Sequence, residues 1–216
     1  MPIPFVHPSS ILIAGPSKSG KTVFVRRLIE EKMLSPMPSR IVLVFSEWQP
    51  EYNMLQKLQP KTEFIKGPMP NELYDSFSAQ EPSLLVLDDQ MTREAYGKTD
   101  QVEKYFVQGS HHKNLSVIFI LQNLFEKGRG IRTSSLNSNY LVLYKNPRDK
   151  GQVATLGRQM YPNKWRSFVA ALDKATEAPH SYLLIDLTQD TPEEFRLRGN
   201  IFTSDEATST DVYITT

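Results

Sequence analysis

One eight-residue segment near the amino terminus combines small residues with a lysine and a threonine at fixed spacing. It reads Gly15, Pro16, Ser17, Lys18, Ser19, Gly20, Lys21, Thr22. Small residues let successive backbone N–H groups curl around an anion without a side chain in the way. The lysine of such a pattern reaches the β- and γ-phosphates of a nucleotide, and the hydroxyl that follows joins a magnesium shell. The segment therefore predicts a phosphate-binding P-loop that takes ATP with Mg²⁺, with Thr22 as a metal ligand.

The surroundings of this segment support the prediction. An apolar run at 11–14 precedes it, and an amphipathic helical pattern over 21–34 follows, which Pro36 and Pro38 would end. The positive end of that helix would point at the same anion. The alternative is a chance turn of glycine and serine, which this context makes the weaker interpretation. For Lys18 both a phosphate contact and a solvated side chain stay open.

An acidic pair follows a second apolar run. Residues 84–87 are Leu-Leu-Val-Leu, and Asp88 and Asp89 come next. In an open α/β sheet the carboxyl end of a strand faces the ligand crevice, so this pattern predicts a Walker B strand. Asp88 would help to hold magnesium, and Asp89 would orient the attacking water. Glutamate is commoner than aspartate at the second position in motor ATPases, so the role of Asp89 is the less secure one, and an acidic turn is the alternative.

A polar amide ends the next apolar run. The strand pattern over 116–121 is followed by Gln122 and Asn123. An amide can accept from a water and donate to a phosphate at the same time, which is what a sensor of the γ-phosphate needs. The additional-strand class of P-loop proteins places such a strand between the P-loop strand and the Walker B strand. A plain polar strand cap is the alternative for Gln122.

The apolar runs and helical patterns alternate along the chain. Strands are expected at 11–14, 41–45, 84–87, 117–121, 141–144 and 182–187, with a shorter one at Glu63–Lys66, and helices at 21–34, 51–58, 100–109, 149–160 and Trp165–Ala175. Continuous rather than alternating apolar runs indicate strands that are buried on both faces of a parallel sheet. The predicted fold is an α/β P-loop NTPase of the additional-strand (RecA/FtsK-like) class, with a mainly parallel central sheet flanked by helices.

Composition narrows the remaining possibilities. The chain has 216 residues, which suits one domain, with 25 Lys and Arg against 24 Asp and Glu and no cysteine. Any contact with nucleic acid must then come from a local basic patch. The first residues do not resemble a secretory signal, and no apolar run approaches the roughly 20 residues that span a bilayer. We expect an ATPase domain over 1–202, a flexible tail over 203–216, no membrane association and a place in a virion or a host cell interior.

Several stretches resemble a known family. Those that carry the resemblance are His111 to Lys150, especially Gln-Asn-Leu-Phe from 122 and Asn-Pro-Arg-Asp from 146, and the closing segments Tyr-Leu-Leu-Ile-Asp-Leu from 182 and Leu-Arg-Gly-Asn-Ile-Phe from 197. They resemble the genome-packaging ATPases of Polinton/Maverick elements and related double-stranded DNA viruses. That family belongs with the poxvirus-type packaging ATPases in the FtsK–HerA superfamily. The resemblance runs from about Ser10 to Phe202.

The resemblance implies a ring of subunits around double-stranded DNA that moves a genome into a capsid without regard to sequence. The partners would be other copies of the chain and a capsid or portal protein. A ring motor needs an arginine from a neighbouring subunit, and Arg132 matches the family's Arg-Thr-x-Ser-Leu-Asn pattern. Arg129 and Arg148 are the reserve candidates, and each arginine could instead be a solvated surface residue. The glycine-flanked loop 127–132 could alternatively contact the DNA backbone.

Three rival functions remain open from the sequence. A DNA pump of the FtsK–HerA type outside packaging would share every motif, although no membrane segment or appended recognition domain is evident. A P-loop nucleotide kinase would need an acceptor pocket and an arginine-rich lid. A nucleotide-gated binding protein with little turnover would fit aspartate at position 89. The pair His111 and His112 lacks a third ligand in the sequence, so solvated or capping histidines are favoured over a metal site.

Overall fold

The computed structural model describes residues 5–88, 104–106, 109, 112–124, 137–148, 150–203 and 209–215. Six parallel strands form the body of its main sheet: β2 (Ser10–Ala14), β4 (Arg40–Phe45), β5 (Glu63–Lys66), β6 (Ser83–Asp88), β7 (Leu115–Leu121) and β8 (Tyr140–Tyr144). Three antiparallel strands extend one edge: β9 (Tyr182–Asp186), β10 (Leu197–Gly199) and β11 (Asp211–Tyr213). The predicted α/β fold with a mainly parallel sheet is confirmed.

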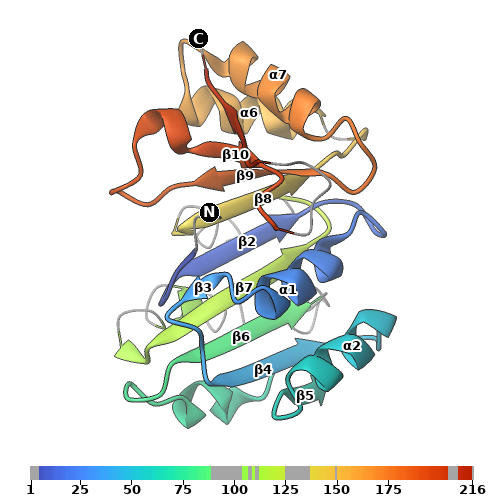
Figure 1. Ribbon diagram of the computed structural model, residues 1–216, viewed down its shortest axis with the longest axis vertical. Coiled ribbons are helices and arrows are strands. Elements are labelled where there is room, and N and C mark those ends of the chain that lie inside the picture. The colour runs from blue at the N-terminus through green and yellow to red at the C-terminus, as the bar shows by residue number, and fades with distance from the viewer. Residues whose placement is uncertain are drawn as a thin grey trace.

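The strand order places the three motif-bearing strands side by side. Among the described residues the order is β11-β10-β9-β8-β2-β7-β6-β4-β5 (Figure 1). The strand β7 lies between β2 and β6, with Ala14 opposite Leu121 and Asp88 opposite Ile120. This is the arrangement of the additional-strand class, as predicted. Because all three strands are parallel, the residues that follow them meet at one edge of the sheet.

Helices cover both faces of the sheet. They are α1 (Lys21–Glu30), α2 (Pro50–Leu58), α6 (Lys150–Met160) and α7 (Trp165–Ala175), with short 3₁₀ turns η1 (Asn71–Ser76) and η2 (Glu193–Phe195). In Figure 1, α1 and α2 lie in front of the sheet, and α6 and α7 lie at its β8–β10 end. A small parallel pair, β1 (Phe5–Val6) and β3 (Leu34–Ser35), flanks α1.

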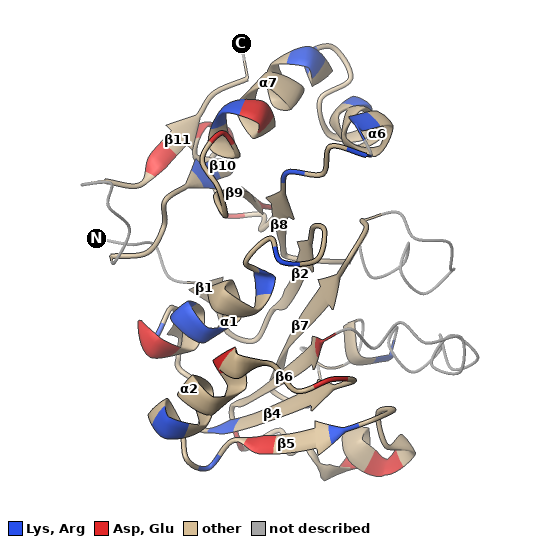
Figure 2. Cartoon of the chain, turned by 90° about the vertical axis from the view of Figure 1, so that its right-hand side faces the viewer, with Lys and Arg blue, Asp and Glu red and all other residues tan. Residues whose placement is uncertain are grey.

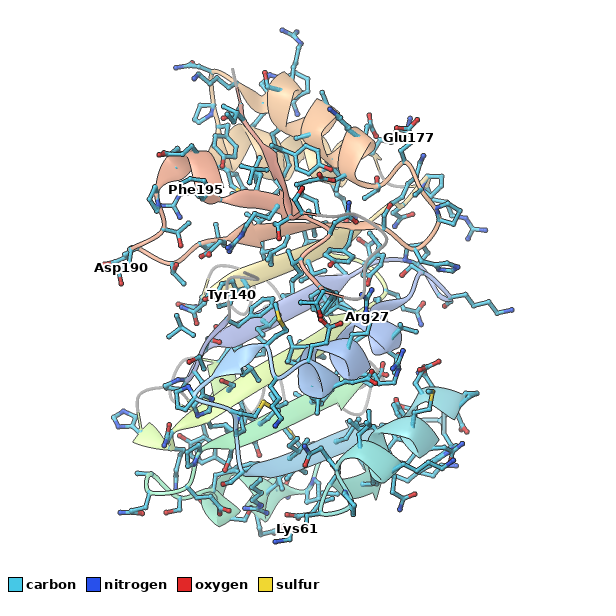
Figure 3. All side chains as sticks on the ribbon, in the orientation of Figure 1. Arg27, Lys61, Tyr140, Glu177, Asp190 and Phe195 are labelled. Atoms are coloured by element: carbon cyan, nitrogen blue, oxygen red, sulfur yellow. The ribbon has the colours of Figure 1, made fainter. Side chains whose placement is uncertain are left out.

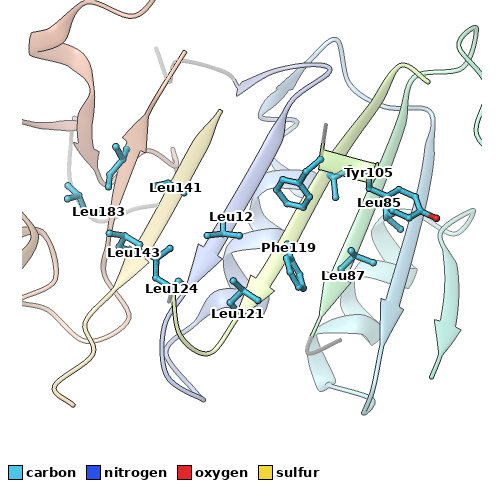
Figure 4. Close-up of a cluster of buried hydrophobic side chains, with 14 of the residues drawn as sticks. Leu12, Leu85, Leu87, Tyr105, Phe119, Leu121, Leu124, Leu141, Leu143 and Leu183 are labelled. Atoms are coloured by element: carbon cyan, nitrogen blue, oxygen red, sulfur yellow. The ribbon is translucent and has the colours of Figure 1, made fainter. Parts of the chain in front are cut away.

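Two apolar cores result from the alternation of side chains along the strands. On β2, Leu12 belongs to a cluster that includes Phe119 (Figure 4). Phe168 of α7 belongs to the same cluster. Its neighbours Ile11 and Ile13 face the other way, into the cluster that the apolar side of α1 completes. Every residue of β2 is buried, which explains why residues 11–14 are continuously apolar rather than alternating.

The first helix is shorter than its pattern indicated. It ends at Glu30 rather than at 34, because Lys32 takes a left-handed backbone conformation with φ 51°. The residues after this turn enter β3 instead of continuing the helix. The other long helices begin and end within one residue of their expected bounds.

Part of the expected flexible tail is a strand of the sheet, so the prediction of a flexible segment from 203 onward is wrong there. Residues 211–213 form β11 and pair with β10, with Tyr213 opposite Leu197. The physical reason is twofold. The edge of β10 offers backbone N–H and C=O groups that another strand can satisfy, and Tyr213 packs against the core on that side.

Some predicted features lie outside the described residues. These are Asp89, Arg129, Arg132 and His111, nearly all of the expected loops at 90–99 and 126–138, and most of the helix expected at 100–109, of which residues 104–106 and 109 are described and helical. Within the described part of the chain, no helix is both long enough and apolar enough to cross a bilayer.

Candidate nucleotide site

A cavity of about 610 Å³ opens at the sheet edge where β2, β6 and β7 end. Its walls include the P-loop from Ser17 to Thr22, the carboxylate of Asp88 and the amide of Gln122. Four of the residues that the sequence predicted to act on a nucleotide (Lys21, Thr22, Asp88 and Gln122) therefore line one space. The strand order brings them together, since they are up to about a hundred positions apart in the chain.

The loop between β2 and α1 depends on glycine at two places. Gly20 stands directly before the first residue of α1. Its φ of 106° is a backbone conformation that residues other than glycine rarely adopt. Gly15 is restricted by packing instead. A Cβ atom there would lie 2.6 Å from Cβ of Tyr144 and 3.0 Å from Oγ of Ser19. The glycines of the pattern thus serve loop curvature at one end and close approach at the other.

The ammonium of Lys21 holds the loop in its present shape. Its Nζ donates to the carbonyl oxygens of Gly15 and Pro16, at 2.7 and 2.8 Å. The side chain is buried, with 9% of the residue exposed. An ammonium has three donors and no acceptor, so it is suited to carbonyls and to phosphate oxygens alike. Lys18 differs, because it is exposed and has φ 64°.

Two residues that the sequence did not single out contact backbone carbonyl oxygens of the loop. The hydroxyl of Tyr144 donates to the carbonyl oxygen of Gly20 at 3.2 Å. Nδ1 of His180 lies 3.3 Å from the carbonyl oxygen of Ser19. Because a carbonyl oxygen only accepts, this contact requires the proton on Nδ1. Tyr144 ends an apolar strand and His180 lies in a turn, so neither carries a pattern that would reveal its role.

The carboxylate of Asp88 is the centre of a buried hydrogen-bond network. Its Oδ2 accepts from Thr22 Oγ1 at 3.1 Å, from Gln49 Nε2 at 3.2 Å and from Tyr52 OH at 2.6 Å. Only 3% of Asp88 is exposed. Three donors on one oxygen satisfy the charge of a carboxylate that burial would otherwise make costly. Gln49 and Tyr52 were not expected at this site, since a glutamine and a tyrosine near a helix start carry no specific signal.

The pair of Thr22 and Asp88 fits a magnesium ion. Mg²⁺ takes oxygen ligands, and in nucleotide sites it usually binds one or two protein groups together with phosphates and waters. A hydroxyl and a carboxylate oxygen 3.1 Å apart are donors of this kind. Among the residues that the structure describes, no group of three or more His, Cys, Asp or Glu side chains could hold a metal by itself.

The remaining predicted residues are placed only in part. Gln122 follows β7 directly and lines the cavity, as the sensor prediction requires, although its action on a phosphate stays a prediction. Arg148 is exposed in the turn after β8, where its backbone N–H donates to the side chain of Asn146 at 3.2 Å. Asp89 and Arg132 lie outside the described residues.

The fold and the phosphate loop define the class: the chain has the fold of a P-loop NTPase with the additional strand. No protein-family model matches it, and no curated protein does either. Among solved structures it is similar to the genome packaging NTPase B204 of Sulfolobus turreted icosahedral virus 2. In complex with ATP-gammaS that protein gives a TM-score of 0.56 at 14% identity, over 85% of this chain and 94% of that one.

Two further structures of B204 proteins show the same similarity in fold. The sulfate complex of the same B204 gives a TM-score of 0.57 at 11% identity, over 85% of this chain and 93% of that one. B204 of Sulfolobus turreted icosahedral virus, described as a DNA-packaging ATPase, gives 0.53 at 11% identity, over 85% and 94%. At these identities the likeness establishes a shared fold. It is consistent with the resemblance to packaging ATPases that the sequence indicated.

The close approach at Gly15 leads to a first testable prediction. Gly15→Ala is expected to weaken nucleotide binding and to lower the free energy of unfolding by about 1–3 kcal/mol, because an overpacked site must displace its neighbours. The measurements are thermal unfolding and titration with a nucleotide. Gly151→Ala is the matched control: it lies in α6 with no atom within 4 Å of its new methyl group, so it should raise stability by up to about 1 kcal/mol. A Gly15→Ala protein as stable as wild type would contradict the packing described here.

Proposed function

We propose that the protein hydrolyses ATP in a magnesium-dependent reaction. The observation that carries this proposal is the convergence of Lys21, Thr22, Asp88 and Gln122 on one cavity. Lys21 would stabilise the charge on the transferred phosphoryl group, and Gln122 would bind the γ-phosphate or the attacking water. Magnesium, held by Thr22 and Asp88 with the phosphates, would neutralise charge between the β- and γ-oxygens. Asp89, the residue after the Walker B strand, is our candidate for orienting the water.

We further propose that hydrolysis drives movement of double-stranded DNA into a capsid. This rests on the sequence resemblance and on the shared fold with B204, a genome packaging NTPase. Such a motor would assemble as a ring, take Arg132 of a neighbouring subunit into its site and dock on a capsid or portal protein. Its place would be a virion or the interior of a host cell. Sizing with an ATP analogue and DNA tests the ring, and a particle that stays monomeric under these conditions counts against it.

The helical hairpin of α6 and α7 is our candidate for the DNA contact. Between 145 and 175 the sequence holds seven Lys and Arg against two Asp, although the whole chain has a net charge of only +1. All seven basic residues are exposed, and Figure 2 shows that Lys and Arg predominate over this hairpin. The guanidinium groups of Arg158 and Arg166 lie 4.2 and 5.0 Å from the ring centre of Trp165. Exposed cations gathered in this way suit a phosphate backbone, which carries no base information.

DNA binding supplies the test of the motor proposal. Affinity for two unrelated duplexes should be equal and should fall steeply with salt, and duplex should stimulate ATP hydrolysis. Lys150→Gln with Arg166→Gln should weaken binding and reduce the slope of log affinity against log salt by about one for each phosphate that is no longer neutralised. The matched control is Lys57→Gln with Lys61→Gln, since Lys61 lies at the opposite end of the molecule (Figure 3). Strong preference for one sequence, or equally weakened binding in both double variants, would contradict the assignment.

A further inference from the structure

One glutamine side chain links the two expected magnesium ligands. Oε1 of Gln49 accepts from Thr22 Oγ1 at 2.9 Å, while Nε2 of the same amide donates to Asp88 Oδ2 at 3.2 Å. Thr22 has one hydroxyl proton and two acceptors within 3.1 Å, so Gln49 and Asp88 share that donor. The amide therefore sets the relative position of the hydroxyl and the carboxylate.

A tyrosine fixes the same carboxylate from a second direction. Tyr52 OH donates to Asp88 Oδ2 at 2.6 Å, the shortest of the three contacts on that oxygen. Tyr52 is 1% exposed, so its hydroxyl has little competition from water. With Thr22 and Gln49, it leaves the carboxylate little freedom to rotate.

Both residues come from a well-anchored part of the chain. Gln49 stands directly before α2, and Tyr52 lies in the first turn of that helix. The Tyr52 ring packs against the rings of Phe45 and Trp48, with centroids 5.2 and 5.5 Å apart. An ion pair of 3.0 Å between Arg26 and Glu51 ties α2 to the P-loop helix α1. Packing of this kind means that α2 presents the two polar groups before any ligand binds.

We propose that Gln49 and Tyr52 are positioning residues, which hold Thr22 and Asp88 in the geometry that binds magnesium together with a nucleotide. Hydrogen-bond partners of metal ligands orient those ligands, and their loss typically costs about 10–100-fold in metal affinity or activity. This inference rests on the proposed function, because it concerns the metal that accompanies ATP. It goes beyond the motif, since neither residue belongs to the P-loop or to the Walker B strand.

The test separates positioning from plain structural support. Binding of a fluorescent ATP analogue is measured in EDTA and over a magnesium titration, for wild type and Tyr52→Phe. The phenylalanine keeps the ring packing and removes only the hydroxyl. We expect unchanged affinity in EDTA and a rise of about tenfold in the magnesium concentration that gives half of the affinity gain. Gln49→Met, which keeps the volume of the side chain, should shift the midpoint in the same direction.

Tyr140→Phe is the matched control. Tyr140 is also buried, and its hydroxyl accepts a hydrogen bond of 3.0 Å from the backbone of Val6, away from the cavity (Figure 3). This variant should lose stability at most and keep the magnesium midpoint of wild type. An unshifted midpoint in Tyr52→Phe, or the same shift in both tyrosine variants, would overturn the inference.

Fluorescence of tryptophan gives a readout that does not depend on turnover. The chain has two tryptophans, so in a Trp165→Phe background the signal comes from Trp48, whose ring contacts that of Tyr52. Magnesium added to the nucleotide complex should change this signal in the background protein at lower concentrations than with Tyr52→Phe. Equal concentrations would count against the inference. A wild-type protein that binds no nucleotide, with or without magnesium, would instead refute the proposed function.

Discussion

Lys21→Ala is expected to abolish measurable ATP hydrolysis and to weaken nucleotide binding strongly. In the P-loop pattern, the ammonium of this lysine contacts the β- and γ-phosphates. Loss of a donor that stabilises charge in the transition state costs about 100-fold or more in rate. In the described structure Nζ also binds the carbonyl oxygens of Gly15 and Pro16, so alanine removes two hydrogen bonds that shape the loop. The measurements are phosphate release and titration with a nucleotide.

The control for this variant is Lys57→Ala. Lys57 is an exposed lysine in the last turn of α2, and its replacement removes the same charge at a distance from the loop. It should keep the turnover of wild type. Thermal unfolding of both variants shows whether the fold is retained. Normal turnover in a folded Lys21→Ala protein would refute the proposed ATPase.

Asp88→Asn should remove the magnesium dependence of nucleotide binding together with hydrolysis. Asparagine has almost the same shape, but it lacks the charge and replaces one carboxylate oxygen by a donor. The amide oxygen can take the place of Oδ2 and accept from Thr22, Gln49 and Tyr52, but without the negative charge these hydrogen bonds and any bond to a metal are weaker. We expect a decrease of about 100–1,000-fold in rate, and equal nucleotide affinity with magnesium and with EDTA.

Glu63→Gln provides the comparison for Asp88→Asn. Glu63 is another hydrogen-bonded carboxylate, with donors from the guanidinium of Arg40 at 2.8 and 3.2 Å, but it lies on the edge strand β5. Its neutralisation should leave the magnesium dependence intact. If Asp88→Asn still responded to magnesium as wild type does, Asp88 would have no part in holding the metal, and the role of the β6 carboxylate would need another explanation.

Much of the fold could be predicted because its signals are local. Continuous apolar runs identified the strands β2, β4, β6, β7, β8 and β9, since a strand buried on both faces has no polar positions to alternate. The position of β7 between β2 and β6 followed from its place after the Walker B strand. Errors arose where long-range contacts override local composition. The polar residues around β11 suggested a flexible tail, but the open edge of β10 pairs with them.

The sequence by itself located the phosphate loop and predicted its chemistry. The spacing from Gly15 to Thr22 and the acid after a buried strand predict which groups would meet a nucleotide, because that function needs fixed residue types at fixed distances along the chain. Only the tertiary structure decided which other side chains complete the site. Gln49 and Tyr52 from the start of α2, Tyr144 from the end of β8 and His180 from a turn reach it through contacts 27 to 161 positions apart in the chain. Such contacts depend on strand order and helix packing, which no local pattern encodes.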